Sequence, residues 1–585
     1  MHSIVNRRSA IKGIGVGALG LAGAALFGCG DGSNAGGTGQ VAAGKSGQVE
    51  GATSGKGLPL NAPVVQGKKK EGGVYTLSGG ATTQVQFDGH TALAGNIHHV
   101  IGEKALEPDP VTMKITPHVV QSWEVPDKGG LTLILKLHPK LFIHNKPPWN
   151  GRQFTAEDLA WNLERHRGLY AERLKIPKAS FQRASMVENL IKAEAVDPLT
   201  CKVTLSKPNA SFFNGLLEVR VMLMPREMDD IGYTDPMKMG NIGPYEVAEW
   251  VTDTRTVFKK NPRYAEFQPG QPHFDTFRTI GIPDTVAAQS AFISGQIATV
   301  AVGAPDLLDA IRRGRPDANL YTWVDSNWFH VRPSYDFPPF KDYRVRQAMH
   351  LAFDYKRQGD SEYGKDGGWA YMAALHPAFP EGWSSDKVQS IAGYNPDTKA
   401  ADMAEAQKLM TAAGYPNGKG IGYEIVHSGS TNNHALRWEA MMKEAFTEMK
   451  PVVKPLGGGA TFANRQAKGD FNMLAYTITA TTDPVIEMIS QYRTGGSRNY
   501  GNFSNTDLDR IIDKTLSELN ADARKQLLEE FQQKWISEWR PMYVMHANAT
   551  KTMVQANVAG FHEIAGTWSA YNAQNKIRLL QYVDK

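Results

Sequence analysis

Cysteine is scarce in this chain, because its 585 residues contain only Cys29 and Cys201. Two cysteines cannot build a disulfide framework, so the folded part must be held together by a large hydrophobic core. Cys201 lies in the alternating segment 201–205, which predicts a β-strand. A single cysteine in such a strand is expected to act as a small apolar side chain.

Long apolar runs are also missing. The run from Gly13 to Gly28 has 16 residues and is rich in Gly and Ala, whereas a membrane-spanning helix needs about 20 strongly apolar residues. Arg7 and Arg8 stand just before this run. The pattern is typical of a twin-arginine export signal that is removed from the mature protein.

The end of this signal, residues 26–29, resembles the lipobox of bacterial lipoproteins, and that resemblance implies a lipid on Cys29. Phe27 departs from it, because a lipobox usually has a small residue there. Plain cleavage followed by free secretion is the alternative. In both cases the folded part works outside the cytoplasm, in a periplasm or at a cell surface. Whether the cell has an outer membrane stays open.

Apolar periodicity is absent from residues 30–71, which are rich in Gly, Ala, Ser and Thr. Such a composition predicts a flexible linker. The basic triplet 68–70 is expected to be either the solvated end of this linker or a segment drawn to a membrane surface.

A net charge is lacking in the folded part. The chain has 64 basic and 59 acidic side chains, and residues 1–71 carry eight of the basic and three of the acidic ones. Residues 72–585 therefore carry 56 of each. A neutral body has no net field to hold a polyanion, so we expect no nucleic-acid partner.

Catalytic and metal-binding motifs are missing as well. The sequence has no G-x-S-x-G, H-E-x-x-H or P-loop motif, and its one G-x-G-x-x-G, residues 15–20, lies inside the signal. No H-x-x-x-H or Cys/His cluster occurs, and the neighbours His98 and His99 would point in different directions on a helix. We therefore expect no catalytic residue, no cofactor and no metal.

What is present is a mixture of strand and helix patterns, which predicts an α/β protein. Residues 131–137 predict a strand, and Thr155 followed by Asp158 predicts the start of a helix. Further helices are expected at 345–353, 400–413 (closed by Gly414), 506–519 and 521–539. No internal repeat appears.

Motifs in a fixed order resemble one family. The strongest is P-F-K-D-Y-R-V-R-Q-A at 339–348, and the others lie at 117–125, 142–158, 196–210, 241–245, 261–264, 291–297, 483–484 and 502–509. Each motif alone is weak, but together they cover nearly all of residues 72–585. The chain resembles the extracytoplasmic solute-binding proteins of the peptide/nickel ABC importers, the oligopeptide- and dipeptide-binding class.

This resemblance implies a two-lobed clam of the type II periplasmic-binding-protein kind with an additional inserted subdomain. After the signal (1–29) and linker (30–71), lobe I would comprise about 72–98, 222–325 and 550–585. The inserted subdomain would be about 99–221 and lobe II about 326–549, with a hinge near Asp325 and near Lys551. Such a protein captures a small molecule or peptide between its lobes and delivers it to permease subunits in the membrane. A monomer is expected.

The family resemblance also places the candidate ligand residues. Trp323, Trp328 and His330 lie on or beside the first crossing segment, where they could stack on a ligand or belong to the core. In peptide binders of this family an acidic residue three positions before Asp483 holds the ligand's ammonium group. Here that position is Ala480. The further candidates of the same stretch are Tyr476, Asp483, Arg493, Arg498 and Tyr500, of which the last three could receive an anionic or sugar-like group.

Two other classes of function remain open. The chain could be the ligand-binding lobe of a sensor, or an enzyme exported in the folded state by the twin-arginine route. The solute itself, whether peptide, sugar or metal chelate, is not identified by the sequence.

Overall fold

The computed structural model describes residues 58–584, except 80–86, 92–95, 109–114, 182, 219, 283, 303–304, 365–368, 455–458 and 565–575. The predicted signal residues Arg7 and Arg8 and the predicted lipid site Cys29 therefore lie outside the described residues. Residues 45–585 belong to one compact unit.

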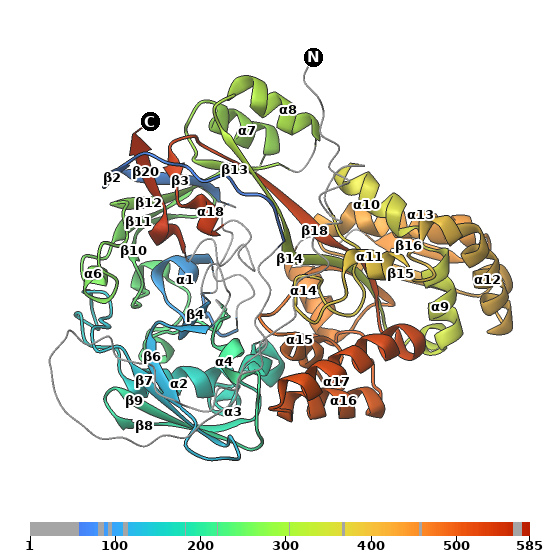
Figure 1. The fold of residues 1–585 in the computed structure, drawn as a ribbon, viewed down its shortest axis with the longest axis horizontal. Coiled ribbons are helices and arrows are strands. Elements are labelled where there is room, and N and C mark those ends of the chain that lie inside the picture. The colour runs from blue at the N-terminus through green and yellow to red at the C-terminus, as the bar shows by residue number, and fades with distance from the viewer. Residues whose placement is uncertain are drawn as a thin grey trace, which may run out of the picture. The chain divides into compact units, whose positions relative to one another are not determined.

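A seven-stranded mixed sheet runs through this unit, in the order β13-β18-β14-β17-β15-β16 with β1 added on β14. Its longest strands, β14 and β18, pair antiparallel from Asn319↔Val554 to Val331↔Tyr543 (Figure 1). β15 pairs parallel with β16 and β17. The strands are β1 (Leu58–Asn61), β13 (Thr299–Ala301), β14 (Asn319–Pro333), β15 (Gly422–His427), β16 (Lys450–Lys454), β17 (Met473–Thr479) and β18 (Tyr543–Val554).

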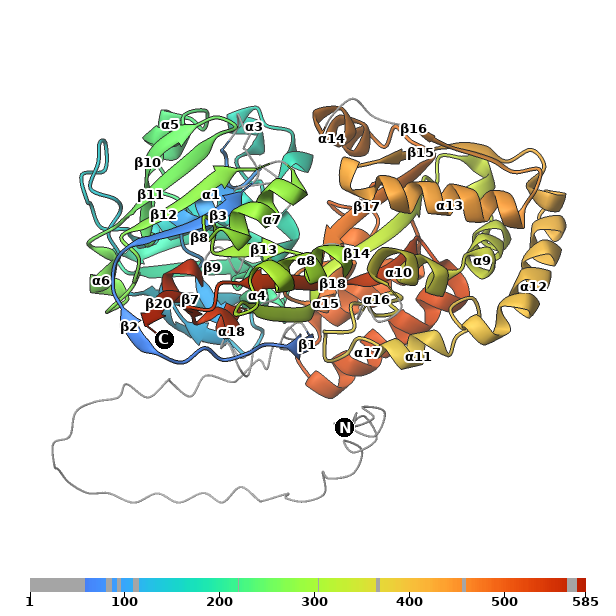
Figure 2. The same cartoon turned by 90° about the horizontal axis from the view of Figure 1, so that it is seen from above.

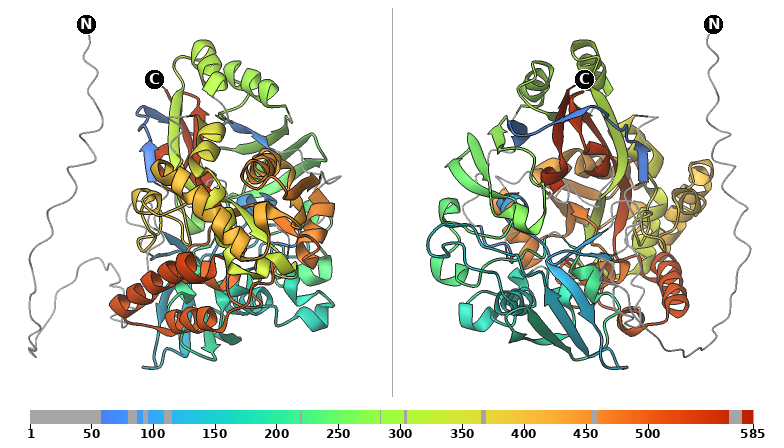
Figure 3. Two further views of the ribbon diagram at one scale, coloured as in Figure 1. Left: turned by 90° about the vertical axis from the view of Figure 1, so that its right-hand side faces the viewer. Right: turned by 60° about the vertical axis from the view of Figure 1, so that its left-hand side comes forward.

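Helices from the second half of the chain cover one end of this sheet, as Figures 2 and 3 show for α12, α13, α16 and α17. They enclose a large hydrophobic core that includes the fully buried Trp328, Trp438 and Trp535. The helices of this half are α9 (Tyr343–Ala352), α10 (Tyr355–Tyr363), α11 (Ser385–Gln389), α12 (Lys399–Ala412), α13 (Asn432–Ala445), α14 (Gly459–Lys468), α15 (Pro484–Gln491), α16 (Thr506–Ser517) and α17 (Ala521–Lys534), which continues into a π-helical turn at Trp535–Trp539.

Smaller sheets are formed by the first half of the chain together with its C-terminal segment, which contributes β19, α18 and β20. One has the order β10-β11-β12-β3, a second β6-β7-β9-β8, a third β19-β20-β2, and β4 pairs with β5. Their strands are β2 (Lys68–Lys70), β3 (Val74–Gly79), β4 (Leu106–Pro108), β5 (Ile115–Pro117), β6 (Val120–Glu124), β7 (Thr132–Leu137), β8 (Leu190–Asp197), β9 (Thr200–Leu205), β10 (Tyr245–Val251), β11 (Arg255–Lys260), β12 (Thr276–Gly281), β19 (Val558–Ala559) and β20 (Gln581–Asp584).

The helices of this half are short. They are α1 (Asn96–Ile101), α2 (Ala156–His166), α3 (Ala171–Leu174), α4 (Phe212–Gly215), α5 (Met228–Ile231), α6 (Tyr264–Phe267), α7 (Thr285–Ile293), α8 (Pro305–Gly314) and α18 (Phe561–Ile564). Residues from Tyr75 to Ala298 form a second large core with Tyr321, Val554 and Leu580. β14 and β18 thus contribute side chains to both cores. The predicted lobe and hinge limits remain a prediction.

Local signals in the sequence give the predicted helix ends. Thr155 and Asp158 form a capping box at the start of α2, with the Asp158 carboxylate accepting a 2.9 Å bond from the Thr155 amide. Gly414 follows α12 with a φ of +91°, a conformation that favours glycine. Cys201 is buried in β9, as its alternating segment predicts.

The predicted flexible linker includes residues 58–61 and 68–70, but in the structure both segments form strands. β1 pairs with β14, and the lysine triplet forms β2 by pairing with β20 at the other end of the chain. These strands depend on partners more than 250 residues away, so local composition carries no signal for them.

None of the helices in the described part of the chain is long and apolar enough to cross a membrane.

Gly243, in the 241–245 motif, packs directly on the end of α1. A Cβ at this position would lie 2.4 Å from the carbonyl carbon and oxygen of Ile101. We therefore expect Gly243→Ala to lower the free energy of unfolding by roughly 1–3 kcal/mol, because overpacking forces the backbone apart. Gly429→Ala is the matched control, since nothing lies within 4 Å of its added Cβ. Thermal unfolding of both variants checks this, and equal melting temperatures would contradict it.

Candidate functional site

The two halves of the chain meet where β17 ends and α15 begins. Asp483 caps α15 by accepting bonds from the amides of Val485 (2.8 Å) and Ile486 (3.3 Å). The same carboxylate is fully buried and forms an ion pair with Arg524 at 2.9 Å.

The Asp483 carboxylate also binds the first half of the chain. The Ser211 hydroxyl donates to it at 2.9 Å, and the Asn214 side-chain amide donates at 2.8 Å. In return, the Thr482 hydroxyl donates to the Asn214 carbonyl at 2.6 Å. Asp483 is therefore occupied by protein partners, and these contacts join the two halves of the chain at a buried point.

Further polar contacts surround this junction. The Arg493 guanidinium forms two ion pairs, one with the Glu188 carboxylate of the first half at 3.0 Å and one with the Asp513 carboxylate of its own half at 3.0 Å. The Ala210 amide donates to the Leu516 carbonyl at 2.9 Å. Arg493 is thus an ion-pair partner across the junction in this structure, and its predicted role as a ligand contact stays a prediction.

Three buried arginines gather beside Ala480. Arg220 donates to the Ala480 carbonyl at 3.4 Å, and Arg498 donates to the Thr479 carbonyl at 3.2 Å. Arg183, from the first half, is 5% exposed and lies within electrostatic range of both. Burial, with the added effect of Arg220 and Arg498, lowers the pKa of Arg183 to about 9.

Negative charge in this group comes from two buried glutamates. Glu218 pairs with Arg220 at 2.7 Å. Burial opposes its ionisation, yet Arg220 and Arg183 hold its pKa down to about 2. Glu487 accepts a bond from the Thr481 amide at 2.9 Å, and burial raises the pKa of its carboxyl group. Among the described residues of this group, three arginines thus stand beside two glutamates.

Aromatic rings lie next to the arginines on β14 and β17. His330 packs edge-on against Tyr476 with ring centroids 5.9 Å apart, and Tyr476 packs edge-on against Tyr500 at 6.4 Å. The ring centroids of Trp328 and His330 lie 5.2 Å apart. Burial, with Arg332 and Arg498 nearby, holds the pKa of His330 well below its ordinary value, so its imidazole is neutral.

The structure brings five of the predicted ligand residues together beside Ala480, while Asp483 and Arg493 belong to the junction described above. Trp328, His330, Tyr476, Arg498 and Tyr500 form one continuous group that ends near Ala480. Trp323 is partly buried and packs against the other core. Whether any of these residues touches a solute remains a prediction.

Three residues of this group, Arg183, Arg220 and Glu218, are not among the predicted ligand residues. Two of them do have a signal in the sequence. Glu218 and Arg220 interrupt the apolar segment 216–224, and charged residues in a buried segment are kept only when they are paired or needed. Arg183 has no such signal.

One group of side chains elsewhere has the composition of a metal site. Single ligand atoms of Glu103, Glu107 and His118 lie within 4.8 Å of one another. However, the Arg578 guanidinium lies 2.6 Å from the Glu107 carboxylate, and the Lys104 ammonium group lies 3.8 Å from the same carboxylate. Two cations already compensate these carboxylates, so the group fits an ion-pair network that ties the C-terminal segment to β4 better than it fits a metal ion.

The fold and the junction define a class of protein. A mixed α/β chain with two large cores, two long antiparallel strands shared by both, and a polar junction beside them has the architecture of the type II periplasmic binding proteins. A search of solved structures agrees. DppA from Helicobacter pylori in complex with the peptide STSA has a TM-score of 0.74 at 17% identity, covering 88% of this chain and 99% of that one. AgaA from A. tumefaciens R10 in complex with agropinic acid has a TM-score of 0.72 at 19% identity, covering 88% and 99%.

The sequence comparisons give the family. Residues 114–500 match the model of the bacterial extracellular solute-binding proteins, family 5, and the chain belongs to that family. It is also 24% identical over 359 residues to the glutathione-binding protein GsiB of Escherichia coli (strain K12). That match covers 61% of this chain and 64% of the relative's length. The predicted resemblance to the peptide/nickel-type ABC solute-binding proteins is thereby confirmed.

The Asp483 junction can be tested directly. Asp483→Asn is expected to lower the free energy of unfolding by roughly 3–5 kcal/mol, because it leaves the buried Arg524 guanidinium without its carboxylate. Asp522→Asn, an exposed position on α17, is the control. Thermal unfolding with small-angle scattering checks this. The variant should melt earlier and its halves should separate. A variant that melts and scatters like the control would contradict the assignment.

Proposed function

We propose that this chain is the extracytoplasmic solute-binding component of an ABC importer, and that the solute it captures carries an anionic group. The supporting observation is the surplus of buried guanidinium groups beside Ala480, where peptide binders of this family carry an acidic residue for the ligand's ammonium. Arg183, Arg220 and Arg498 would instead favour a carboxylate or another oxyanion.

The arginine group suits capture by domain closure. Arg183 and Arg220 come from the first half of the chain, and Arg498 comes from the second. An anion held between them would attract both halves at once, so it would bind the closed state more tightly and shift the equilibrium toward it. Delivery of that closed form to the permease completes the proposed role. The chain binds and does no chemistry in this account.

The known relatives take different solutes. By their names, GsiB binds glutathione, DppA is in complex with a peptide and AgaA is in complex with agropinic acid. The family therefore leaves the solute open, and side chains of this chain must decide it. The aromatic group of His330, Tyr476 and Tyr500 would supply an apolar surface beside the charged one.

A sensor's ligand-binding lobe is the second candidate function. It would use the same group of side chains beside Ala480, so the geometry does not favour it over import. Genes for two permeases and two ATPases beside this one would support import, whereas a lone gene beside a sensor kinase would support the other role.

A thermal-shift screen tests the proposed solute class. Short peptides, oligosaccharides, nickel chelates and opines are offered to the purified chain. A solute at 100 times its dissociation constant should add about 2.7 kcal/mol of stability. We expect hits among compounds with a free carboxylate or other anionic group. Hits confined to neutral or cationic compounds would contradict the proposal.

The solute found in this way should depend on Arg183. Arg183→Gln removes one guanidinium group and is expected to weaken binding about tenfold or more, since a hydrogen bond to a charged group is worth about 1.5–3 kcal/mol. Arg173→Gln is the control, because its side chain is 63% exposed. Calorimetric titration of both variants measures the effect. Equal affinities would show that Arg183 does not face the solute.

We further propose that the twin-arginine signal exports the folded chain and that a lipid on Cys29 anchors it. Cys29→Ser is expected to abolish labelling by a radioactive fatty acid and to release the protein from the membrane fraction. Cys201→Ser is the control, since Cys201 is buried in β9. Labelling that persists in the Cys29 variant would refute the anchor.

A further inference from the structure

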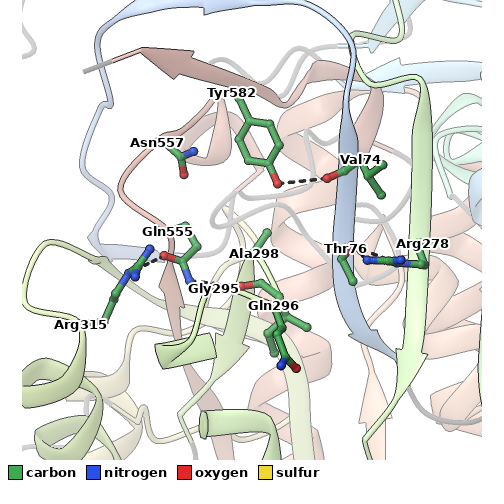
Figure 4. A pocket seen from close by; sticks show the side chains of 11 residues that line it. Val74, Thr76, Arg278, Gly295, Gln296, Ala298, Arg315, Gln555, Asn557 and Tyr582 are labelled. Atoms are coloured by element: carbon green, nitrogen blue, oxygen red, sulfur yellow. Dashed lines mark hydrogen bonds between the residues drawn. The ribbon is translucent and has the colours of Figure 1, made fainter. Parts of the chain in front are cut away.

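A pocket lies apart from the junction, where the ends of β14 and β18 meet the sheet that contains β3 and β12. Its volume is about 330 Å³, and its lining includes Thr76, Arg278, Gln296, Arg315, Gln555 and Tyr582 (Figure 4). Arg315 precedes β14, Gln555 follows β18, and Tyr582 belongs to the C-terminal strand β20. None of the residues at the Ala480 junction lines it.

The charged side chains of the pocket are both cationic. Arg278 and Arg315 stand on opposite sides of it in Figure 4, and no aspartate or glutamate among the described residues lines it. Asp317 lies 3.5 Å from Arg315 but outside the lining. The pocket therefore offers positive charge from two directions.

Neutral acceptors hold the two guanidinium groups in place. Arg315 donates through Nε to the Gln555 side-chain oxygen at 2.9 Å. Arg278 donates through Nη2 to the Thr76 hydroxyl at 3.0 Å. Arg315 also donates through Nη1 to the Ile293 carbonyl at 3.5 Å, and Arg278 also donates through Nε to the Thr76 hydroxyl at 3.3 Å. Each guanidinium has five N–H donors, so these contacts leave some donors of each arginine available. The described residues include no ion-pair partner for Arg278.

The walls around these arginines are fixed by hydrogen bonds between distant segments. The Gln555 side-chain amide donates to the Phe292 carbonyl at 2.7 Å, and the Ala298 amide donates to the Thr76 carbonyl at 2.8 Å. The Tyr582 hydroxyl donates to the Val74 carbonyl at 3.3 Å. A pocket tied in this way loses little conformational freedom when a ligand binds.

We propose that this pocket binds a small organic molecule that carries two or more negative charges. Its volume lies at the lower end of the range for small-molecule sites, about 300–1,000 Å³, which exceeds the need of a single inorganic ion. Guanidinium groups on both sides match carboxylates or phosphates at the two ends of a ligand. The site is independent of the proposed solute site at Ala480.

Calorimetric titration of the purified full chain tests this proposal, with citrate as the organic polyanion and inorganic phosphate as the inorganic one. We expect citrate to bind more tightly than phosphate. The double variant Arg278→Gln/Arg315→Gln should weaken citrate binding about tenfold or more, whereas Arg312→Gln, an exposed arginine of α8 outside the lining, should leave it unchanged. Circular dichroism verifies that each variant is folded.

A second variant tests the pocket even if the double arginine variant does not fold. Asn557 is exposed at the pocket, and Asn557→Asp adds a negative charge there without removing an arginine, so it too should weaken citrate binding. Citrate binding that is lost in Arg183→Gln but kept in the pocket variants would place the anion at the Ala480 junction and overturn the proposal. Absence of citrate binding, or phosphate binding more tightly than citrate, would also overturn it.

Discussion

The antiparallel pairing of β14 with β18 ties the two large hydrophobic cores of the structure together. Both strands pass from one core to the other: Trp328 and Val544 pack in the core of the second half of the chain, and Tyr321 and Val554 pack in the core that contains Tyr75. Trp323 packs against one core and Val324 lies in the other, so β14 changes cores between these two residues. The register shifts between Val324 and Trp328 and again between Phe329 and His330. Such an irregularity weakens the ladder locally and increases its twist. The hinge near Asp325 and near Lys551 stays a prediction.

The charges where the two halves of the chain meet fall into two groups. Asp483 has partners on both halves of the chain, so its negative charge is balanced by the protein. Beside it, Arg220 pairs with Glu218, and burial together with Arg220 and Arg498 lowers the pKa of Arg183. Buried guanidinium groups of this kind attract carboxylates and other oxyanions. An anionic solute, as proposed, would add such an attraction at this point.

The family and the general fold could be predicted because their signals are local or repeated in order. The capping box at Thr155 and Asp158 and the glycine at 414 need only neighbouring residues, and the ordered motifs add up over the chain. Strands β1 and β2 could not be predicted, since Leu58 pairs with Val324 and Lys69 with Val583. Their sequences fit a strand only where those partners exist.

The candidate site shows the same physical limit, and its ligand-binding role stays a prediction. Tyr476, Arg498 and Tyr500 lie near the motif at 483–484, whereas His330 meets Tyr476 only through the pairing of β14 with β17. Arg183 and Arg220 reach this place through the contact between the two halves, which no motif encodes. The bonds of Asp483 to Ser211, Asn214 and Arg524 depend on tertiary structure alone.

The charge of the solute proposed to bind beside Ala480 can be determined directly. The protein is purified from the cells that make it and denatured, and the released small molecule is identified by mass spectrometry. We expect a compound with at least one carboxylate or other anionic group, present in about equal molar amount with the protein. A neutral or cationic compound in that amount would contradict this expectation.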